Sequence, residues 1–331
     1  MTVPSGALRF NSDSGKLEYY NGEVWWQIDN FSADNATGGA RGVFMFGSSG
    51  SYVNNIEYIT ISTTGNAIDF GDIATARGYG GAFASSTRGI FAAGQSGGSN
   101  RNAIDYITIS STGNGISFGN LTVALIRYPS GCSNSTRGMV VGGYDGTNVF
   151  NVIQYVTISQ TGNTVDFGDL ATVSYAGATC SSSTRGVHAT GNNGPAIINT
   201  IEYFTISTLG NSADFGDLVT ATIASGGLSN STRGLFGGGY VPTLTNTINY
   251  VTIATLGNAI DFGDLTSGRG YAASMSSSTR GVFATGGAFP AGSNVIDYVT
   301  IMSTGNAVDF GDTSTGAPLG ASGCSNAHGG L

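Results

Sequence analysis

The sequence predicts an all-β fold, a six-bladed β-propeller with four strands in each blade and a small N-terminal β-meander. A phrase centred on Arg-Gly recurs six times, a phrase of the form Tyr-Val-Thr-Ile keeps step with it, and no segment has the apolar spacing of a helix. Four short strands in about 48 residues, repeated six times, are typical of propeller blades. A parallel β-helix is the alternative, although its coils need only about half this period.

The arginines of the repeated phrase follow one another at intervals of 47, 49, 48, 48 and 47 residues. They are Arg41, Arg88, Arg137, Arg185, Arg233 and Arg280. We interpret them as structural residues rather than an anion-binding ring, because the residue before each repeated tyrosine carries an oxygen atom that could accept a bidentate contact from the guanidinium. Those oxygen-bearing residues are Glu57, Asp105, Gln154, Glu202, Asn249 and Asp297.

One repeat shows the expected order of strands. We predict a first strand at 78–85, a second at 88–94, a third at 103–110 and a fourth at 115–120. The first strand is rich in Gly, Ala and Ser, which suits the position nearest the axis, where blades crowd together. The Gly-Asn pair between the third and fourth strands predicts a tight hairpin.

The ends of the repeat predict how the ring closes. The first complete element is a second strand at 40–47, and the last is a first strand at 318–326. Six complete blades result only if this C-terminal strand joins the three N-terminal ones, which leaves no open edge where the ends meet. We therefore predict a meander over residues 1–30, a linker over 31–39 and the propeller over 40–331.

Composition excludes several classes of partner. A formal net charge of -8 with a single lysine argues against nucleic acid. Three cysteines without a Cys-x-x-Cys pair, Cys132, Cys180 and Cys324, predict buried free thiols. The start of the chain lacks the features of a cleaved export signal, and no apolar run is long enough to span a bilayer, so we expect a soluble protein without membrane insertion.

No motif predicts catalysis, a metal site or a cofactor. Asp-Phe-Gly-Asp recurs five times, but Ser117 and Asn120 replace both acids in one repeat, which favours capping of turn amides over calcium binding. The two histidines, His188 and His328, have no nucleophile motif nearby. We expect a non-enzymatic protein with no cofactor.

The repeats differ most in the link between the second and third strands. In a propeller these links share one side of the disk with the fourth-to-first links, and we name that side the variegated face. The opposite side, with near-identical Ser-Ser-Thr-Arg and Thr-Gly-Asn turns, is the uniform face. A constant scaffold with one variable face is typical of binding proteins, although loop tips also drift without function. The candidate ligand-binding residues are Tyr52, Arg101, Tyr144, Asp145, Phe150, Tyr240, Val241 and Phe289.

The N-terminal segment, residues 6–28, predicts three short strands joined by two tight turns. Such a meander is too small to be stable alone. Its aromatic side chains would pack on the propeller, on other copies or on another protein. We assign four of them to attachment or oligomerisation: Tyr19, Tyr20, Trp25 and Trp26.

Two parts of the sequence carry a resemblance. The phrases TRGVFATGG, IDYVTI and TGNAVDFGD resemble kelch-like propeller repeats of tailed-bacteriophage virion proteins, over residues 40–326, although no blade has the tryptophan of eukaryotic kelch repeats. Residues 6–28 resemble a short segment of phage tail-fibre and other virion structural proteins.

This resemblance implies a non-catalytic virion protein on the surface of the phage particle, in the tail or the capsid. It implies a tail-fibre or receptor-binding component that recognises a host-surface glycan or protein through one propeller face. A capsid or tail decoration protein with no host ligand is the alternative, and a polysaccharide-acting enzyme is a third possibility. Other virion proteins are the implied partners, and a homotrimer is expected by analogy with phage fibres.

Overall fold

A computed structural model of the chain describes residues 3–11, 16–28, 40–45, 47–48, 51–123, 126–189, 191–288, 291–314, 316 and 318–331. These residues form strands, turns and bends and contain no helix, so the predicted all-β class is confirmed. The predicted linker over 31–39 lies outside the described residues.

The N-terminal segment folds as the predicted meander. Strands β1 (Leu8–Asn11), β2 (Lys16–Tyr20) and β3 (Trp25–Ile28) form an antiparallel sheet in that order. Arg9 donates to Glu18 on the neighbouring strand at 2.8 Å, and its guanidinium lies over the Trp25 ring at 4.2 Å.

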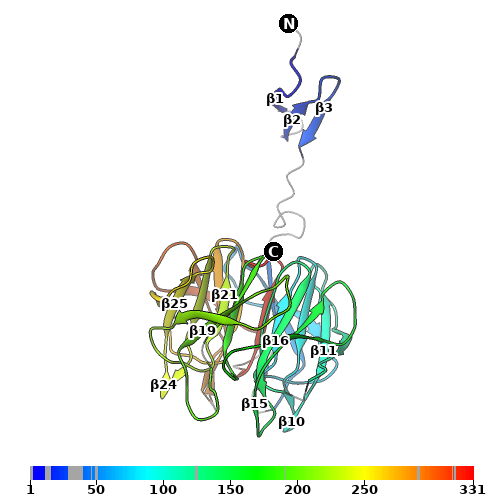
Figure 1. Cartoon of the computed structure of the whole chain (residues 1–331). Helices are drawn as coiled ribbons and strands as arrows, with labels where there is room; N and C mark the ends of the chain where they lie inside the picture. The colour runs from blue at the N-terminus through cyan, green and yellow to red at the C-terminus, as the bar shows by residue number, and fades with distance from the viewer. Residues whose placement is uncertain are drawn as a thin grey trace.

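The rest of the described chain forms six four-stranded antiparallel sheets, which share one order of strands from first to fourth (Figure 1). The first strands are β33 (Ser322–Ser325), β7 (Gly81–Ala84), β13 (Ser130–Ser133), β17 (Ala178–Ser181), β21 (Gly226–Ser229) and β27 (Ala273–Ser276). The second strands are β4 (Arg41–Met45), β8 (Arg88–Ala92), β14 (Arg137–Tyr144), β18 (Arg185–Ala189), β22 (Arg233–Gly237) and β28 (Arg280–Ala284).

The third strands are β5 (Asn55–Thr60), β11 (Ala103–Thr108), β15 (Val149–Thr157), β19 (Thr200–Thr205), β25 (Thr247–Thr252) and β31 (Val295–Thr300). The fourth strands are β6 (Ile68–Asp72), β12 (Ile116–Asn120), β16 (Val165–Asp169), β20 (Ala213–Asp217), β26 (Ile260–Asp264) and β32 (Val308–Asp312). Short hairpin strands complete the elements: β9 (Gln95–Ser96), β10 (Ser99–Asn100), β23 (Tyr240–Val241), β24 (Thr243–Leu244), β29 (Gly287–Ala288) and β30 (Ala291–Gly292). We number the sheets 1 to 6, in this order.

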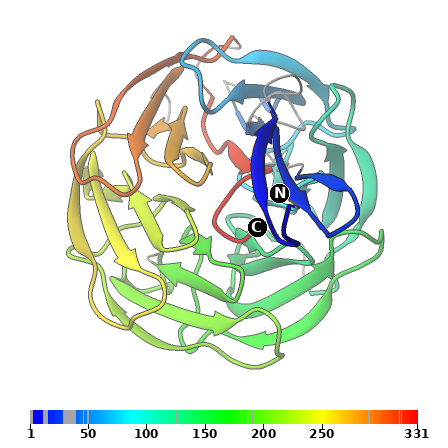
Figure 2. The same ribbon diagram turned by 90° about the horizontal axis from the view of Figure 1, so that it is seen from above.

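Sheet 1 joins the two ends of the repeat region. Its first strand, β33, pairs with β4 from Ser322 opposite Met45 to Ser325 opposite Gly42. Each first strand also contacts the first strand of the next sheet, and β33 contacts both β7 and β27. The six sheets therefore lie around one axis, with the first strands innermost (Figure 2).

Serine hydroxyl groups form hydrogen bonds between neighbouring first strands. The hydroxyl of Ser181 donates to the Ser133 carbonyl, and that of Ser229 donates to the Ser181 carbonyl, both at 2.7 Å. Ser133, Ser276 and Ser325 make the equivalent contact at 2.7 Å. Small polar residues in the first strand thus satisfy the close packing at the axis.

Apolar cores fill the spaces between neighbouring sheets. Phe70 and Ile73, from the end of sheet 1, belong to one buried cluster with Ile107 and Ile109 of sheet 2. The three cysteines lie in different clusters of this kind and are buried free thiols, as predicted. Each sheet therefore buries its faces only when both neighbours are in place.

The repeated arginines connect each sheet to the next rather than pairing with the preceding acids. The guanidinium of each donates to an isoleucine carbonyl of the following sheet at 2.7–3.2 Å. In chain order the acceptors are Ile109, Ile158, Ile206, Ile253, Ile301 and Ile61. Each guanidinium also lies 4.4–4.8 Å from the ring centre of the repeated tyrosine of its own sheet. The predicted bidentate pairing with the oxygen-bearing residues is wrong.

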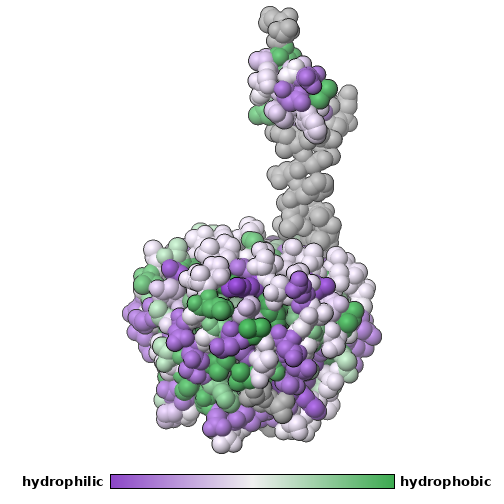
Figure 3. Space-filling view, turned by 45° about the vertical axis from the view of Figure 1, so that its right-hand side comes forward, coloured by the Kyte–Doolittle hydropathy of each residue, from purple (hydrophilic) through white to green (hydrophobic). Residues whose placement is uncertain are grey.

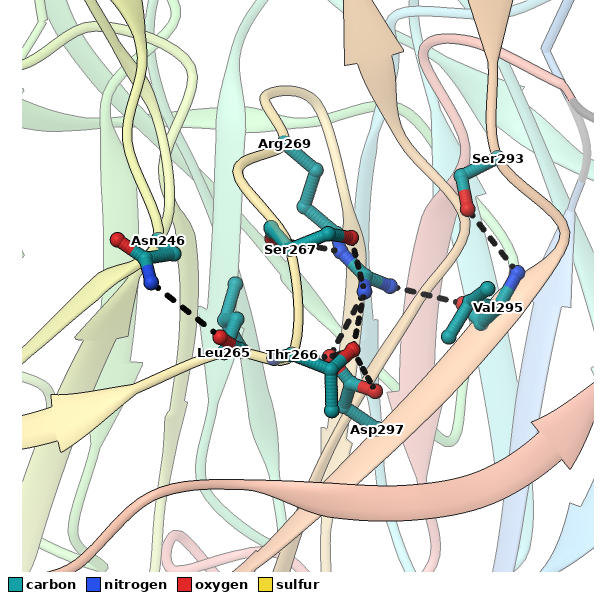
Figure 4. Close-up of polar contacts among 8 residues, drawn as sticks. All are labelled: Asn246, Leu265, Thr266, Ser267, Arg269, Ser293, Val295 and Asp297. Carbon is teal, nitrogen blue, oxygen red and sulfur yellow. Dashed lines mark hydrogen bonds and ion pairs between the residues drawn. The ribbon is translucent and has the colours of Figure 1, made fainter.

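Five of the six oxygen-bearing residues bind the link that enters their sheet. Asp297 accepts from Arg269 at 2.7 Å and from the Thr266 hydroxyl at 2.8 Å, in a site where both charged side chains are fully buried (Figure 4). Asp105 accepts from Arg77 at 2.5 Å in the same way. The link before each of these two aspartates carries an arginine, which explains why the acid is aspartate in these sheets.

The other sheets have no arginine at this position of the link, and in sheets 1, 3 and 4 the contact is made by backbone and hydroxyl groups. Glu202 accepts from the backbone amides of Ala171 and Thr172 at 2.9 and 3.0 Å. Gln154 accepts from Thr122 and Thr164, and Glu57 accepts from Ser314. In sheet 5 the Asn249 oxygen is buried without a hydrogen-bond partner among the described residues. In the other five sheets this position supplies an acceptor, and the entering link decides whether it needs a charge.

The Asp-Phe-Gly-Asp phrase lies in the outermost strand of five sheets, and Ser-Phe-Gly-Asn takes its place in sheet 2. A register shift between Ile104 and Asp105 leaves Phe118 as a bulge, and the same irregularity occurs in all six sheets. Short, bulged edge strands that carry exposed acids resist pairing with another chain. Figure 3 shows hydrophilic side chains interspersed with hydrophobic ones on the flank of the ring.

The sequence predicts that the acids of the outer strand accept from turn amides. In the structure the asparagine of each Gly-Asn turn is the acceptor, and a backbone amide in the outer strand of the neighbouring sheet is the donor. The Asn114 side chain accepts from the Asp72 amide at 3.1 Å, and equivalent contacts of 3.0–3.1 Å join all six sheets, ending with Asn66 and the Asp312 amide. The connection is also longer than the predicted tight hairpin, since residues 61–67 join β5 to β6. Gly71 must be glycine because a Cβ atom would lie 2.5 Å from the Gly113 carbonyl oxygen.

We expect Asp297→Ala to destabilise the protein by about 3 to 5 kcal/mol, because it leaves the buried Arg269 without a countercharge. Asp309→Ala is the matched control, since Asp309 lies opposite Asp297 in the sheet but is exposed, and it should change the free energy of unfolding little. Urea unfolding of the two variants tests this. Equal effects would contradict the assignment of Asp297 as the partner of Arg269.

Candidate functional site

The two ends of the ring differ as the repeat pattern predicts. The hairpin strands β10 and β24 lie on the side opposite the C-terminus (Figure 1). The C-terminal residues cross the axis on the uniform face, where the His328 ring contacts the Ala84 carbonyl at 2.9 Å and the Gly329 amide donates to Ser229 at 2.9 Å. The axis is therefore covered at the uniform face, and the variegated face holds the open end.

A strained ring of backbone surrounds the axis at the variegated face. One residue just before each first strand has a φ angle between 52° and 71°: Tyr79, Tyr128, Ala176, Ala224, Tyr271 and Gly320. The amide of each of the first five donates to the carbonyl of the residue before it around the ring at 2.7–2.8 Å, as in Tyr128 to Tyr79 and Tyr79 to Gly320. Left-handed backbone is costly for a bulky residue such as tyrosine, and such strain is concentrated at functional sites.

Tyrosine side chains gather above this ring. The ring centres of Tyr79, Tyr128 and Tyr271 lie 5.0–5.7 Å from one another. Tyr175 lies 6.0 Å from Tyr128 and stacks on Tyr144 at 5.0 Å. Tyr52 lies 6.5 Å from Tyr79. We call these side chains the tyrosine cluster: Tyr52, Tyr79, Tyr128, Tyr144, Tyr175 and Tyr271.

Two pockets adjoin the tyrosine cluster. The axial pocket, of about 100 Å³, lies within the inner strands and is lined mainly by Gly, Ala and Ser, with Tyr79, Tyr128 and Tyr271 at its mouth. A lateral pocket of about 460 Å³ lies between Tyr240 and Tyr271 and is lined by Ile197, Ile223 and Leu244. Aromatic and aliphatic walls with a few polar groups are typical of ligand sites.

Arg127 is the cation of this site. Its guanidinium carbon lies 5.3 Å from the ring centres of both Tyr128 and Tyr144. Its Nε atom is buried without a hydrogen-bond partner. Among the described residues, no carboxylate lies within ion-pair distance of it.

Burial raises the pKa of several tyrosines in the cluster. The pKa of Tyr79 is raised to about 12, mainly by loss of solvent and further by the nearby Tyr128. Burial also raises the pKa of Tyr52, Tyr128, Tyr175 and Tyr271, and for all five the positive charge of Arg127 opposes the increase. The hydroxyl groups therefore stay protonated at neutral pH.

The predicted ligand-binding residues fall into two groups. Tyr52 and Tyr144 belong to the tyrosine cluster, and Tyr240, which is 41% exposed, forms the wall of the lateral pocket with Val241 beside it in β23. Arg101 is exposed and pairs with Ile126, next to Arg127.

The remaining three predicted residues do not join the site. Phe150 is half-buried in β15 and packs against a core cluster that includes Ile126, so it is a packing residue and not a ligand contact. The Asp145 carboxylate accepts from the Thr147 and Asn148 amides of its own turn at 2.7 and 2.6 Å. Phe289 lies outside the described residues.

The attachment residues lie in two rows across the meander. Tyr19 lies opposite Trp26, and Leu8 lies opposite Tyr19, so three apolar side chains that are 40–62% exposed form one row. Tyr20 and Trp25 face each other in the second row, with ring centres 5.2 Å apart. The first row is an apolar surface that the described chain does not cover.

The two histidines have structural contacts. His188 is buried between the hydroxyl groups of Ser130 and Ser174, at 3.3 and 3.1 Å, and burial lowers its pKa to about 4. His328 binds at the axis, and burial also lowers its pKa. Within the described ranges, no three His, Cys, Asp or Glu side chains are grouped to hold a metal ion. The same ranges contain no helix able to cross a lipid bilayer.

Sequence reasoning missed the centre of the site. Tyr79, Tyr128, Tyr175, Tyr271 and Arg127 come from the short segments before four different first strands. A signal was present, because an aromatic residue precedes a strand otherwise made of Gly, Ala and Ser in four of the six repeats. These segments lie at least 47 positions apart in the sequence, and only the ring of sheets brings them together.

Comparison with models of known protein families and with curated protein sequences finds no match for this chain. A functional proposal therefore rests on the geometry of the site and on the resemblance of the sequence phrases.

We expect the folded protein to lose stability as the pH rises from 10 towards 12. The pKa of Tyr79 is near 12 in the folded chain and 10 in the unfolded one, so the favourable contribution is complete below 10 and is lost as the pH passes through the folded value. Phenolate absorbance should show a high-pH phase that shrinks in Tyr79→Phe and moves further up in Arg127→Gln. A single ordinary titration step, unchanged in both variants, would contradict this electrostatic account.

Proposed function

We propose that this chain is a six-bladed β-propeller that serves as a non-catalytic recognition protein on the surface of a tailed-phage particle. The observation that carries the proposal is the tyrosine cluster, held on strained backbone at the open end of the ring. Six sheets around one axis, each linked to the next by an arginine, support the propeller over the parallel β-helix. The recognised ligand would be a host-surface glycan or protein.

Strain at the cluster supports binding over a purely structural role. Ala176, Ala224 and Gly320 occupy the same ring position with small side chains, so the scaffold itself does not require tyrosine there. Tyrosine is also the residue that rigid binding surfaces use most, since it offers a large contact area with little conformational entropy to lose. Tyr79, Tyr128 and Tyr271 thus fit a ligand contact.

The position at which the N-terminal segment joins the ring supports attachment at the uniform face. The second strand of sheet 1 begins next to Ala40, and the Arg41 amide donates to Asn326 beside the uniform face. The N-terminal segment therefore joins the ring at the face away from the tyrosine cluster. We propose that Tyr19, Tyr20, Trp25 and Trp26 contact another virion protein or other copies in a homotrimer.

A decoration protein without a host ligand is the second candidate. The exposed apolar row of Leu8, Tyr19 and Trp26 favours it, because that surface needs a partner whatever the variegated face does. Catalysis is not part of either proposal: both histidines contact core groups, and the paired acids of each outer strand lie on its exposed edge.

We expect the purified protein to bind intact cells of one strain in a panel of bacteria, and Tyr144→Ser with Tyr240→Ser to reduce that binding about tenfold or more. Leu209→Ser is the control, since Leu209 is an exposed apolar residue in the connection between β19 and β20 on the uniform face. Flow cytometry of labelled protein measures the binding.

Three results would decide between the candidates. Loss of binding in the tyrosine variant alone supports recognition through the variegated face. Binding that resists the tyrosine changes would contradict this use of the face. No binding to any cells, together with attachment to phage particles that requires residues 1–30, would favour the decoration protein.

A further inference from the structure

We propose that Arg127 is an anion-binding residue and that the tyrosine cluster takes an acidic saccharide, whose carboxylate pairs with the guanidinium while its ring lies on tyrosine. This inference rests on the proposed function, since it names the ligand class of the same face. It goes further because it assigns a chemical role to one residue and a charge to the ligand.

Arg127 differs from the other half-buried or buried arginines of the ring in having no acceptor. The six repeated arginines donate to isoleucine carbonyls, and Arg77 and Arg269 pair with aspartate. No hydrogen bond from the Arg127 side chain reaches any other described residue, and its Nε atom is buried. A partly desolvated guanidinium without an acceptor is costly, so an anion from outside the chain would satisfy it.

Three of the tyrosine hydroxyl groups around Arg127 are further donors without an acceptor among the described residues. Tyr52 and Tyr144 donate to Gln95 and to the Gly146 carbonyl, both at 2.6 Å. Within the part of the chain that the structure describes, the hydroxyls of Tyr79, Tyr128 and Tyr271 have no such partner. Phenol groups beside a guanidinium offer a carboxylate several donors and no competing negative charge.

The whole chain has a net negative charge, but the loops and links of the variegated face do not. Its loops and links carry only three charged residues that are not in buried ion pairs: Arg101, Arg127 and Asp145. The Asp145 carboxylate is occupied by its own turn, whose amides hold its pKa below the ordinary value. Half of the acids of the chain lie instead on the outer strands, so an anion approaching the axis meets a locally positive site.

A saccharide fits the remaining features better than a polyanion does. Tyrosine faces accept the C–H face of a pyranose ring, and the mouth of the axial pocket presents three such rings within 5.7 Å of one another. Nucleic acid would need several cations along one track, but the chain has a net charge of -8 and this face has only two arginines outside buried ion pairs. One acidic sugar needs only the single cation that Arg127 supplies.

Calorimetric titration of the full chain tests the inference with trimers of galacturonate and of sialic acid, each beside its uncharged methyl ester. We expect at least one acid to bind about tenfold more tightly than its ester. Arg127→Gln should remove that preference, and Arg127→Lys should restore part of it. Arg9→Gln is the charge-matched control, because it removes the same charge from strand β1 of the meander, and it should keep the preference.

Other outcomes would overturn the inference and still bear separately on the proposed function. Equal affinity for acid and ester, or an acid preference that survives Arg127→Gln in a variant with an unchanged unfolding midpoint, would contradict the role of Arg127. If no acidic trimer binds but the protein binds bacterial cells through Tyr144 and Tyr240, the ligand class is wrong and the recognition function stands. If neither saccharides nor cells bind, the recognition function fails as well.

Discussion

The contact of each arginine with the next sheet is the interaction on which the structure depends. Arg280 of sheet 6 donates to Ile61 of sheet 1, over 219 residues of sequence, just as Arg41 donates to Ile109 over 68. Every guanidinium also covers a tyrosine of its own sheet, so one side chain fixes both the sheet and its neighbour. A change in one repeat would misplace two sheets, which explains why the phrase varies so little.

Where this constraint ends, the sequence is free to vary. The Gly-Asn turns, the arginines and the inner serines all bond to an adjacent sheet through their side chains. The second-to-third links bond to the next sheet through backbone groups, as where the Gly94 amide donates to the Ile126 carbonyl at 3.0 Å, and such bonds do not depend on the side chain. Variation there costs little stability, and the ring position before the first strand accepts Tyr, Ala or Gly. The result is a scaffold in which a ligand site can change without disturbing the ring.

Much of this fold could be predicted from the sequence because each repeat carries the same local signals. Strand order, the small residues of the first strand and the pairing of the last strand with β4 follow from period and composition. The partner of the repeated arginine could not be predicted, since a backbone carbonyl of another sheet leaves no mark in the sequence. Phe150 was misjudged because β15 begins at Val149, so that Phe150 lies in a strand and not in the second-to-third link. The tyrosine cluster was missed because only the ring brings its members together.

Truncation tests the closed ring most directly. A chain that ends at residue 318 lacks β33, so sheet 1 has no first strand and both of its neighbours lose an inner contact. A chain that begins at residue 29 lacks only the meander and serves as the control. Closure predicts that the first variant loses its cooperative thermal transition or aggregates, while the control keeps the transition of the full chain. Equal transitions in both variants would contradict a ring held shut by its last strand.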